Sequence, residues 1–151
     1  MAWIDGTEEQ TLTINVPAQR VLEYFSTPTQ FGEAYVDAES IEHVEGNVYK
    51  FNLVEKTEKG IKFQGQYTVE YTVGDGRVDW THTGEGNMRT TGSVVIHSQD
   101  ADATELTYSE TLSPNLPIPD LMARVFKPIV SRQISAGIAT FLERSKAQLE
   151  A

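Results

Sequence analysis

The C-terminal part of the chain constrains the fold more than any other segment. Residues 113–119 form a passage with three prolines, and an amphipathic pattern then continues almost to Ala151. Its apolar residues recur mostly three or four positions apart, at Leu121, Val125, Ile129, Ile134, Ile138, Phe141, Leu142 and Leu149. This spacing places them on one face of a long helix. A helix that follows many strands has to bury such a face against a sheet, and a curved sheet would leave a cavity between the two layers. We therefore expect a binding cavity under this helix.

The preceding residues are predicted to form one strand, two short helices and six further strands. Alternating apolar and polar residues indicate the first strand at 9–16. Pro17 and Pro28 introduce helices at 18–25 and 28–35, because proline is tolerated in a first helical turn. The later strands are expected at 41–44, 49–56, 61–73, 77–84, 88–98 and 104–112. Short links rich in Gly, Asn and Asp favour tight hairpins between antiparallel neighbours, so we expect one domain over residues 1–151.

The alternation also predicts which side chains face the core. In the strand at 61–73, one face carries Ile61, Phe63, Tyr67, Val69, Tyr71 and Val73, and the other face is polar. The strands at 77–84 and 104–112 differ, because their inner faces include Trp80 and His82 in one and Tyr108 and Glu110 in the other. These polar side chains would give the cavity a polar side.

Charge and composition exclude several classes of protein. Lys and Arg number 12 against 22 Asp and Glu, and the net charge of −10 argues against nucleic-acid binding. No apolar run is long enough for a transmembrane helix and no signal peptide opens the chain, so we expect a cytoplasmic protein without integral membrane contact. The absence of Cys excludes disulfides and thiolate chemistry.

Two stretches of the chain are distinctive: the Val-Pro-Ala-Gln-Arg-Val-Leu-Glu-Tyr-Phe helix at 16–25, and the entry into and end of the last helix, from Leu116 to Lys146. With the order of the other elements, they resemble the START / pollen-allergen-like (SRPBCC) superfamily. The branch is similar to polyketide cyclase/dehydrase-like proteins or to the G-type subunit of carbon monoxide dehydrogenase. The resemblance implies an α+β helix-grip fold, with a curved seven-stranded antiparallel sheet around a long C-terminal helix and two short helices after the first strand. It also implies a cavity for a lipid, a polyketide or a similar apolar molecule.

Nine residues are candidates for ligand binding in such a cavity. They are Phe51, Phe63, Tyr67, Trp80, His82, Tyr108, Glu110, Met122 and Phe126. Glu110, His82 and Tyr108 are also candidates for catalysis, because a carboxyl group in an apolar cavity would have a raised pKa and could act as an acid or base with His82. The alternative is structural: Arg89 or Arg132 would neutralise Glu110, and His82 would be a satisfied histidine of the wall.

No metal or cofactor site is expected. His43, His82 and His97 fall on three different predicted strands, without the spacing of a metal site. The Gly-rich stretches near Gly74 and Gly84 lack the following helix that phosphate-binding loops need, and they are interpreted as hairpin turns.

Pro128 lies inside the predicted C-terminal helix. A proline there removes one backbone hydrogen bond and should kink or divide the helix near 126–127. The kink could simply follow the curved sheet, or residues 114–127 could form a movable lid over the cavity.

Three functions remain open at this point. The first is binding or transport of a small hydrophobic molecule by a monomer or homodimer. The second is a cyclase- or dehydrase-like activity that uses Glu110 and His82. The third is an accessory or assembly role, with a cavity filled by the protein's own side chains.

Overall fold

A computed structural model describes all residues from Met1 to Ala151 and contains one antiparallel sheet and one long helix. The strands are β1 (Ala2–Trp3), β2 (Gly6–Ile14), β3 (Ala38–Glu45), β4 (Val48–Glu58), β5 (Ile61–Gly74), β6 (Arg77–Gly86), β7 (Met88–Gln99) and β8 (Thr104–Leu116). They are ordered β1-β8-β7-β6-β5-β4-β3, and β2 also pairs with β8. β1 and β2 pair with β8 one after the other and together occupy the place of one edge strand. The expected order of seven strands is therefore confirmed.

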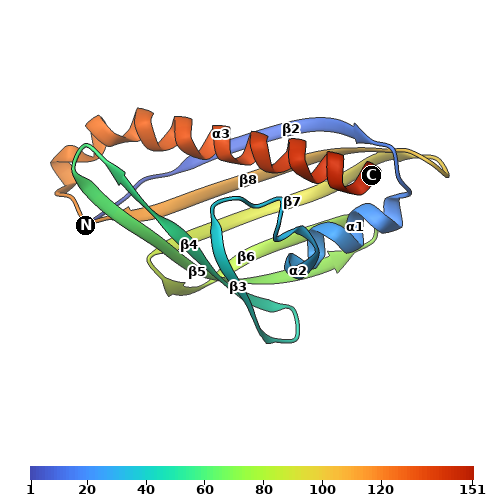
Figure 1. The fold of residues 1–151 in the computed structure, drawn as a ribbon, viewed down its shortest axis with the longest axis horizontal. Coiled ribbons are helices and arrows are strands. Elements are labelled where there is room, and N and C mark those ends of the chain that lie inside the picture. The colour runs from blue at the N-terminus through green and yellow to red at the C-terminus, as the bar shows by residue number, and fades with distance from the viewer.

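The helices lie on one side of the curved sheet (Figure 1). They are α1 (Ala18–Ser26), α2 (Pro28–Phe31), the 3-10 turn η1 (Asp120–Met122) and α3 (Ala123–Glu150). The long α3 runs beside β2 and β8, and α1 and α2 lie near its C-terminal end (Figure 1). Tyr24 of α1 joins these parts, because its hydroxyl is hydrogen-bonded to Ser145 and Gln148 of α3. This arrangement is the expected helix-grip fold.

Two glycines allow the helix and the strands to approach closely. A Cβ atom at Gly6 of β2 would overlap the side chain of Ile134, so the absence of a side chain lets α3 lie directly on this strand. A Cβ atom at Gly65 of β5 would overlap the sulfur of Met88 on β7. A larger residue at Gly6 would have to displace the branched side chain of Ile134, and one at Gly65 would have to displace the flexible end of Met88.

The apolar interior divides into two clusters. The larger one joins α1, α2, the sheet and the C-terminal half of α3, and it includes many aromatic rings. The smaller one lies at the other end, where Ala2, Ile4, Leu116 and Ile118 surround Phe126 and Val130 of α3. The cavity described below lies between these clusters and has residues of both in its wall.

Several sequence-based boundaries need correction. Strand β8 continues to Leu116, because Asn115 and Leu116 pair with β1, so the proline-containing passage starts as strand and not as loop. The second short helix ends at Phe31 and not near Tyr35. Val73 was expected on the inner face, but it is exposed at the end of β5, next to the hairpin.

The start of the C-terminal helix also differs from the prediction. Pro128 does not divide α3, which is continuous from Ala123 to Glu150. Leu121 is 91% exposed and Val125 is 49% exposed, so the buried face begins at Phe126. Phe126 and Leu116 are held in the smaller cluster, so the segment 114–127 is anchored near both ends, and its movement as a lid stays a prediction. None of the helices combines the length with the apolar character that a membrane span requires.

Candidate functional site: a cavity with a buried carboxyl group

A cavity of about 160 Å³ lies between the sheet and the middle of α3. Hydrophobic residues make up 22 of the 31 that line it, and they come mainly from β4 to β8 and from α3. The helix contributes Phe126, Ile129, Val130, Ile134, Ile138 and Phe141. An apolar wall of this kind favours an apolar ligand, and the few polar groups within it have to fix the ligand's orientation.

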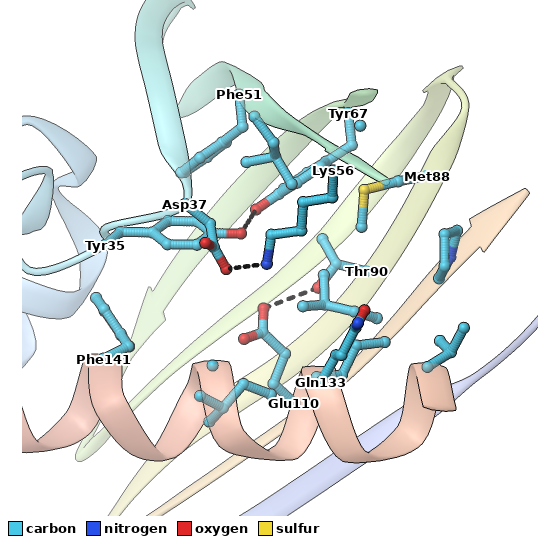
Figure 2. A pocket seen from close by; sticks show the side chains of 18 of the residues that line it. Tyr35, Asp37, Phe51, Lys56, Tyr67, Met88, Thr90, Glu110, Gln133 and Phe141 are labelled. Atoms are coloured by element: carbon cyan, nitrogen blue, oxygen red, sulfur yellow. Dashed lines mark hydrogen bonds and ion pairs between the residues drawn. The ribbon is translucent and has the colours of Figure 1, made fainter. Parts of the chain in front are cut away.

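Glu110 of β8 is the carboxyl group inside this cavity (Figure 2). Its Oε1 accepts a hydrogen bond from the Tyr108 hydroxyl at 2.9 Å. Its Oε2 accepts two, from the Trp80 indole N–H at 3.1 Å and from the Thr90 hydroxyl at 2.9 Å. Glu110 keeps some accessible surface because it lines the cavity, but it lies deep within the molecule. The donors come from three adjacent strands, β6, β7 and β8, so the sheet itself fixes the position of the carboxyl group.

The register of these three strands explains how Trp80 reaches Glu110. Trp80 of β6 pairs with Gly92 of β7, and Gly92 pairs in turn with Glu110 of β8. A Cβ atom at position 92 would overlap the indole ring and approach the backbone oxygen of Ser109 to 2.6 Å. Gly92 therefore leaves the space in which the indole crosses β7 and donates to the carboxylate.

Burial raises the pKa of Glu110, while the hydrogen bonds from Tyr108, Thr90 and Trp80 oppose this rise. No basic side chain neutralises the group. The two arginines considered as partners are engaged elsewhere: the Arg89 guanidinium lies 4.0 Å from the centre of the Trp3 ring, and Arg132 Nε donates to the Pro128 carbonyl. The expectation of an arginine partner for Glu110 was therefore wrong.

Tyrosines supply the other polar atoms of the interior. The hydroxyls of Tyr35 and Tyr67 are 3.0 Å apart and form a hydrogen bond. Tyr71 also lines this cavity. Burial raises the pKa of Tyr35, Tyr67, Tyr71 and Tyr108, so all four are neutral donors at physiological pH.

The mouth of the cavity is polar and is crossed by two contacts. Lys56 Nζ of β4 lies 3.1 Å from Asp37 Oδ2, and both side chains are partly exposed (Figure 2). Gln133 of α3 donates to Glu58 Oε2 at 3.0 Å. These contacts lie where α3 passes β4, on the side of the helix away from β2.

Seven of the nine predicted ligand-binding residues line the cavity. They are Phe51, Phe63, Tyr67, Trp80, Tyr108, Glu110 and Phe126. Met122 does not, because it belongs to η1 and is 39% exposed. His82 does not line it either, so the proposed Glu110–His82 pair is not brought together.

His82 belongs to the regular part of the β5–β6 ladder, where it pairs with Val69 just as Trp80 pairs with Tyr71. The register shifts only beyond His82, in the segment up to Gly86 that contains Gly84 with a positive φ of 99°. The bulge therefore does not account for the absence of His82 from the cavity wall. The His82 ring is hydrogen-bonded through Nδ1 to the Thr90 backbone oxygen at 3.2 Å, as expected for a satisfied histidine of the wall.

Sequence reasoning missed several residues of the site. Thr90 alternates with Met88 along β7, and this pattern could have placed it on the inner face. Tyr35, Asp37 and Lys56 had no such signal, because the first two lie in the irregular connection between α2 and β3 and Lys56 follows a bulge in β4. The three histidines stay on separate strands, β3, β6 and β7, and no three metal-ligating side chains come together.

Comparisons with known proteins bear on the fold. The sequence matches no protein-family model and no curated protein. Among solved structures, it is similar to an aromatase/cyclase from a Streptomyces species, with a TM-score of 0.75, 13% identity, and 97% of this chain and 94% of the other covered. A START superfamily protein from Mycobacterium smegmatis gives a TM-score of 0.69 at 11% identity, over 95% and 97% of the two chains. Norcoclaurine synthase from Thalictrum flavum gives 0.58 at 12% identity, over 99% and 89%. These likenesses show that the chain has the helix-grip fold, as its sequence pattern indicated.

Proposed function

We propose that this protein binds a small aromatic molecule in the cavity between the sheet and α3. The observation that carries the proposal is the cavity itself, which is apolar over most of its wall and polar at Glu110. A cavity of about 150 Å³ is enough to hold benzene. The volume of about 160 Å³ therefore suits a one-ring molecule better than a long lipid or a polycyclic polyketide. The aromatic side chains around it, Phe51, Tyr67, Trp80 and Tyr108, offer edges and faces to such a ring.

The fold supports this proposal in a general way. Two of the solved structures with this fold are described as an aromatase/cyclase and a START superfamily protein. At 13% and 11% identity they support a ligand-binding architecture and not a particular ligand. The choice of a one-ring molecule rests on the cavity volume of this chain alone.

Calorimetric titration with toluene and with oleate tests the proposal. We expect saturable one-to-one binding of toluene and weak or no binding of oleate. Leu53→Trp, which fills the cavity from β4, should weaken toluene binding by about tenfold or more. Val44→Trp is the matched control, because Val44 is 54% exposed on β3 and does not line the cavity. Equal binding by both variants, or none by the wild type, would contradict the proposal.

A cyclase- or dehydrase-like activity is the second candidate. The contact between Glu110 and Tyr108 favours it, because a carboxyl group of raised pKa beside a phenol inside an apolar cavity can exchange protons with a ligand. This version uses Tyr108 in place of His82. Purified protein would be incubated with small poly-β-ketone esters, and product formation followed by mass spectrometry. Turnover that Glu110→Gln abolishes while toluene binding persists would support an enzyme, and turnover unaffected by Glu110→Gln would exclude this mechanism.

The third hypothesis, an accessory protein with a filled cavity, has less support. The side chains of this protein leave about 160 Å³ unfilled, whereas protein interiors otherwise contain few voids larger than a water molecule.

A further inference from the structure

Glu110 is the cavity's one deeply buried charged group, and it lacks a counter-ion. The only basic side chain in the cavity wall is Lys56, which lies at the mouth and pairs there with Asp37. Burying a carboxylate without a cation is costly, because three neutral hydrogen bonds replace water only in part. Trp80, Thr90 and Tyr108 nevertheless all donate to it. The site is therefore built to hold a hydrogen-bond acceptor, and it supplies no positive charge of its own.

The carboxyl group also retains room for a further donor. A carboxylate oxygen can accept two hydrogen bonds. Oε2 already accepts two, from Trp80 and Thr90, whereas Oε1 accepts one, from Tyr108. A ligand in the cavity can therefore donate a hydrogen bond to Oε1.

Aromatic rings surround this position. The rings of Trp80 and Tyr108 are 5.3 Å apart, Tyr71 is 6.0 Å from Trp80, and Phe141 of α3 is 6.0 Å from Tyr108. The face of an aromatic ring attracts a cation, and this attraction is stronger where water is excluded. A carboxylate among aromatic rings is an environment suited to an ammonium group.

We propose that the ligand of this cavity is a small aromatic amine whose ammonium group pairs with Glu110 while its ring lies against the apolar wall. The inference rests on the proposed function, since it requires that a small molecule enters the cavity. It adds that the ligand carries a positively charged ammonium group, a property that the fold alone does not indicate. The ligand brings the missing counter-ion, and no covalent step is involved.

The proposal includes a coupling to pH. In the free protein the pKa of Glu110 is raised, and a bound ammonium would lower it, so binding of the amine favours loss of a proton from Glu110. The other titratable groups near Glu110 are Tyr108 of β8, Tyr67 and Tyr71 of β5, and Tyr35, all of which stay neutral. His82 of β6 is hydrogen-bonded to the Thr90 backbone oxygen and does not line the cavity, and Asp37, Lys56 and Glu58 lie at the mouth. Helix α3 contributes no titratable side chain to the wall.

The test compares three probes of similar size: benzylamine, benzyl alcohol and toluene. Calorimetric titration of the full chain near neutral pH should give benzylamine a dissociation constant about tenfold below that of benzyl alcohol. Glu110→Gln keeps the shape of the side chain and should abolish this preference while toluene still binds. Glu70→Gln, which makes the same change at an exposed position of β5 that does not line the cavity, should keep the preference and is the matched control. In the wild type, the affinity for benzylamine should also fall as pH is lowered through the pKa of Glu110, and the affinity for toluene should not.

Each outcome decides between the two proposals. Binding of all three probes without a preference for benzylamine, or a preference that survives in Glu110→Gln, would overturn the inference and leave the proposed function intact. Failure of toluene and of both other probes to bind would contradict the proposed function and the inference together. The wild-type pH series needs no variant, so poor folding of Glu110→Gln would not prevent a decision.

Discussion

The two ends of the cavity hold their carboxyl groups in opposite ways. At the mouth, Asp37 pairs with the Lys56 ammonium, and the side chains are 30% and 48% exposed. In the interior, Glu110 has no cation and is held by Trp80, Thr90 and Tyr108. An exposed ion pair contributes only about 0–1 kcal/mol, so the mouth contacts can open at low cost. The interior group is fixed by three strands. The proposed ligand would therefore be exchanged at one end of the cavity and recognised at the other.

The helix side of the interior should be the most sensitive to substitution. Phe141 packs against Phe25, Phe31, Tyr35 and Tyr108. Phe141→Ala should lower the free energy of unfolding by about 3–5 kcal/mol, because it removes a buried ring and leaves a void. Urea unfolding measures this, and Val125→Ala, at an exposed position of the same helix, should change it by less than about 0.5 kcal/mol. A loss below about 1 kcal/mol for Phe141→Ala would show that the interior is not held by this packing.

The next effect concerns the space that lets Trp80 reach Glu110. Gly92→Ala should lower the free energy of unfolding by about 1–3 kcal/mol, since the new methyl group overlaps the indole and lies close to a rigid strand backbone. The hydrogen bond from Trp80 to Glu110 should be lost as well, and it is visible as the indole N–H resonance in NMR spectra. Gly74→Ala is the control, because its Cβ would meet only Arg77 at an ordinary 3.5 Å. An unshifted indole resonance in Gly92→Ala would contradict the assigned role.

A third prediction concerns pH and separates the interior carboxyl from those at the surface. Because burial raises the pKa of Glu110, its contribution to stability is complete below the ordinary glutamate pKa and is lost as pH rises through the raised value. A pKa that folding raises by one pH unit corresponds to about 1.4 kcal/mol. Surface acids such as Asp79, beside Arg77, have lowered pKa values and act with the opposite sign at lower pH.

The difference between wild type and Glu110→Gln isolates this contribution. Urea unfolding of both proteins across pH 4 to 8 should give curves that diverge, with the wild type losing stability relative to the variant as pH rises. Thr90→Val removes a hydrogen bond that lowers the Glu110 pKa, so the loss should move to higher pH in that variant. Parallel curves for wild type and Glu110→Gln would mean that the carboxyl group is not desolvated.

Substitution at the mouth should change stability least. Lys56→Met should change the free energy of unfolding by less than about 1 kcal/mol, since it removes a half-exposed ion pair. The same change should speed the dissociation of bound toluene, measured by NMR exchange, because one of the two contacts that cross the mouth is gone. A stability loss above about 2 kcal/mol would make the mouth as rigid as the interior and remove the contrast.

The sequence pattern predicted which residues form the cavity wall better than it predicted the contacts between them. Alternation placed Trp80, Tyr108 and Glu110 on the inner face, because side-chain direction in a regular strand depends only on position along it. Alternation also placed His82 on that face, and its pairing with Val69 agrees, but its ring is hydrogen-bonded to the Thr90 backbone oxygen and does not line the cavity, which alternation alone cannot predict. It also could not find the role of Gly92, which depends on the register of three strands and is invisible in any one of them.

The prediction of the buried face of the C-terminal helix was correct where other elements cover the helix and wrong where none does. The apolar spacing of α3 was correct from Phe126 onward, where the helix lies on the rest of the protein. It placed Leu121 and Val125 on the buried face, but no neighbouring element covers them. The monomer or homodimer state and the cytoplasmic location remain predictions from the sequence.

Uptake of a one-ring molecule into the cavity can be followed residue by residue in an NMR titration of the ¹⁵N-labelled protein with toluene. We predict saturable shifts of amide resonances in the cavity-lining parts of β5 to β8 and α3, including those of Thr90, Glu110 and Phe141. Shifts that do not saturate, or that are confined to the exposed apolar residues Leu121, Met122 and Val125, would place binding on the surface and contradict the proposed function.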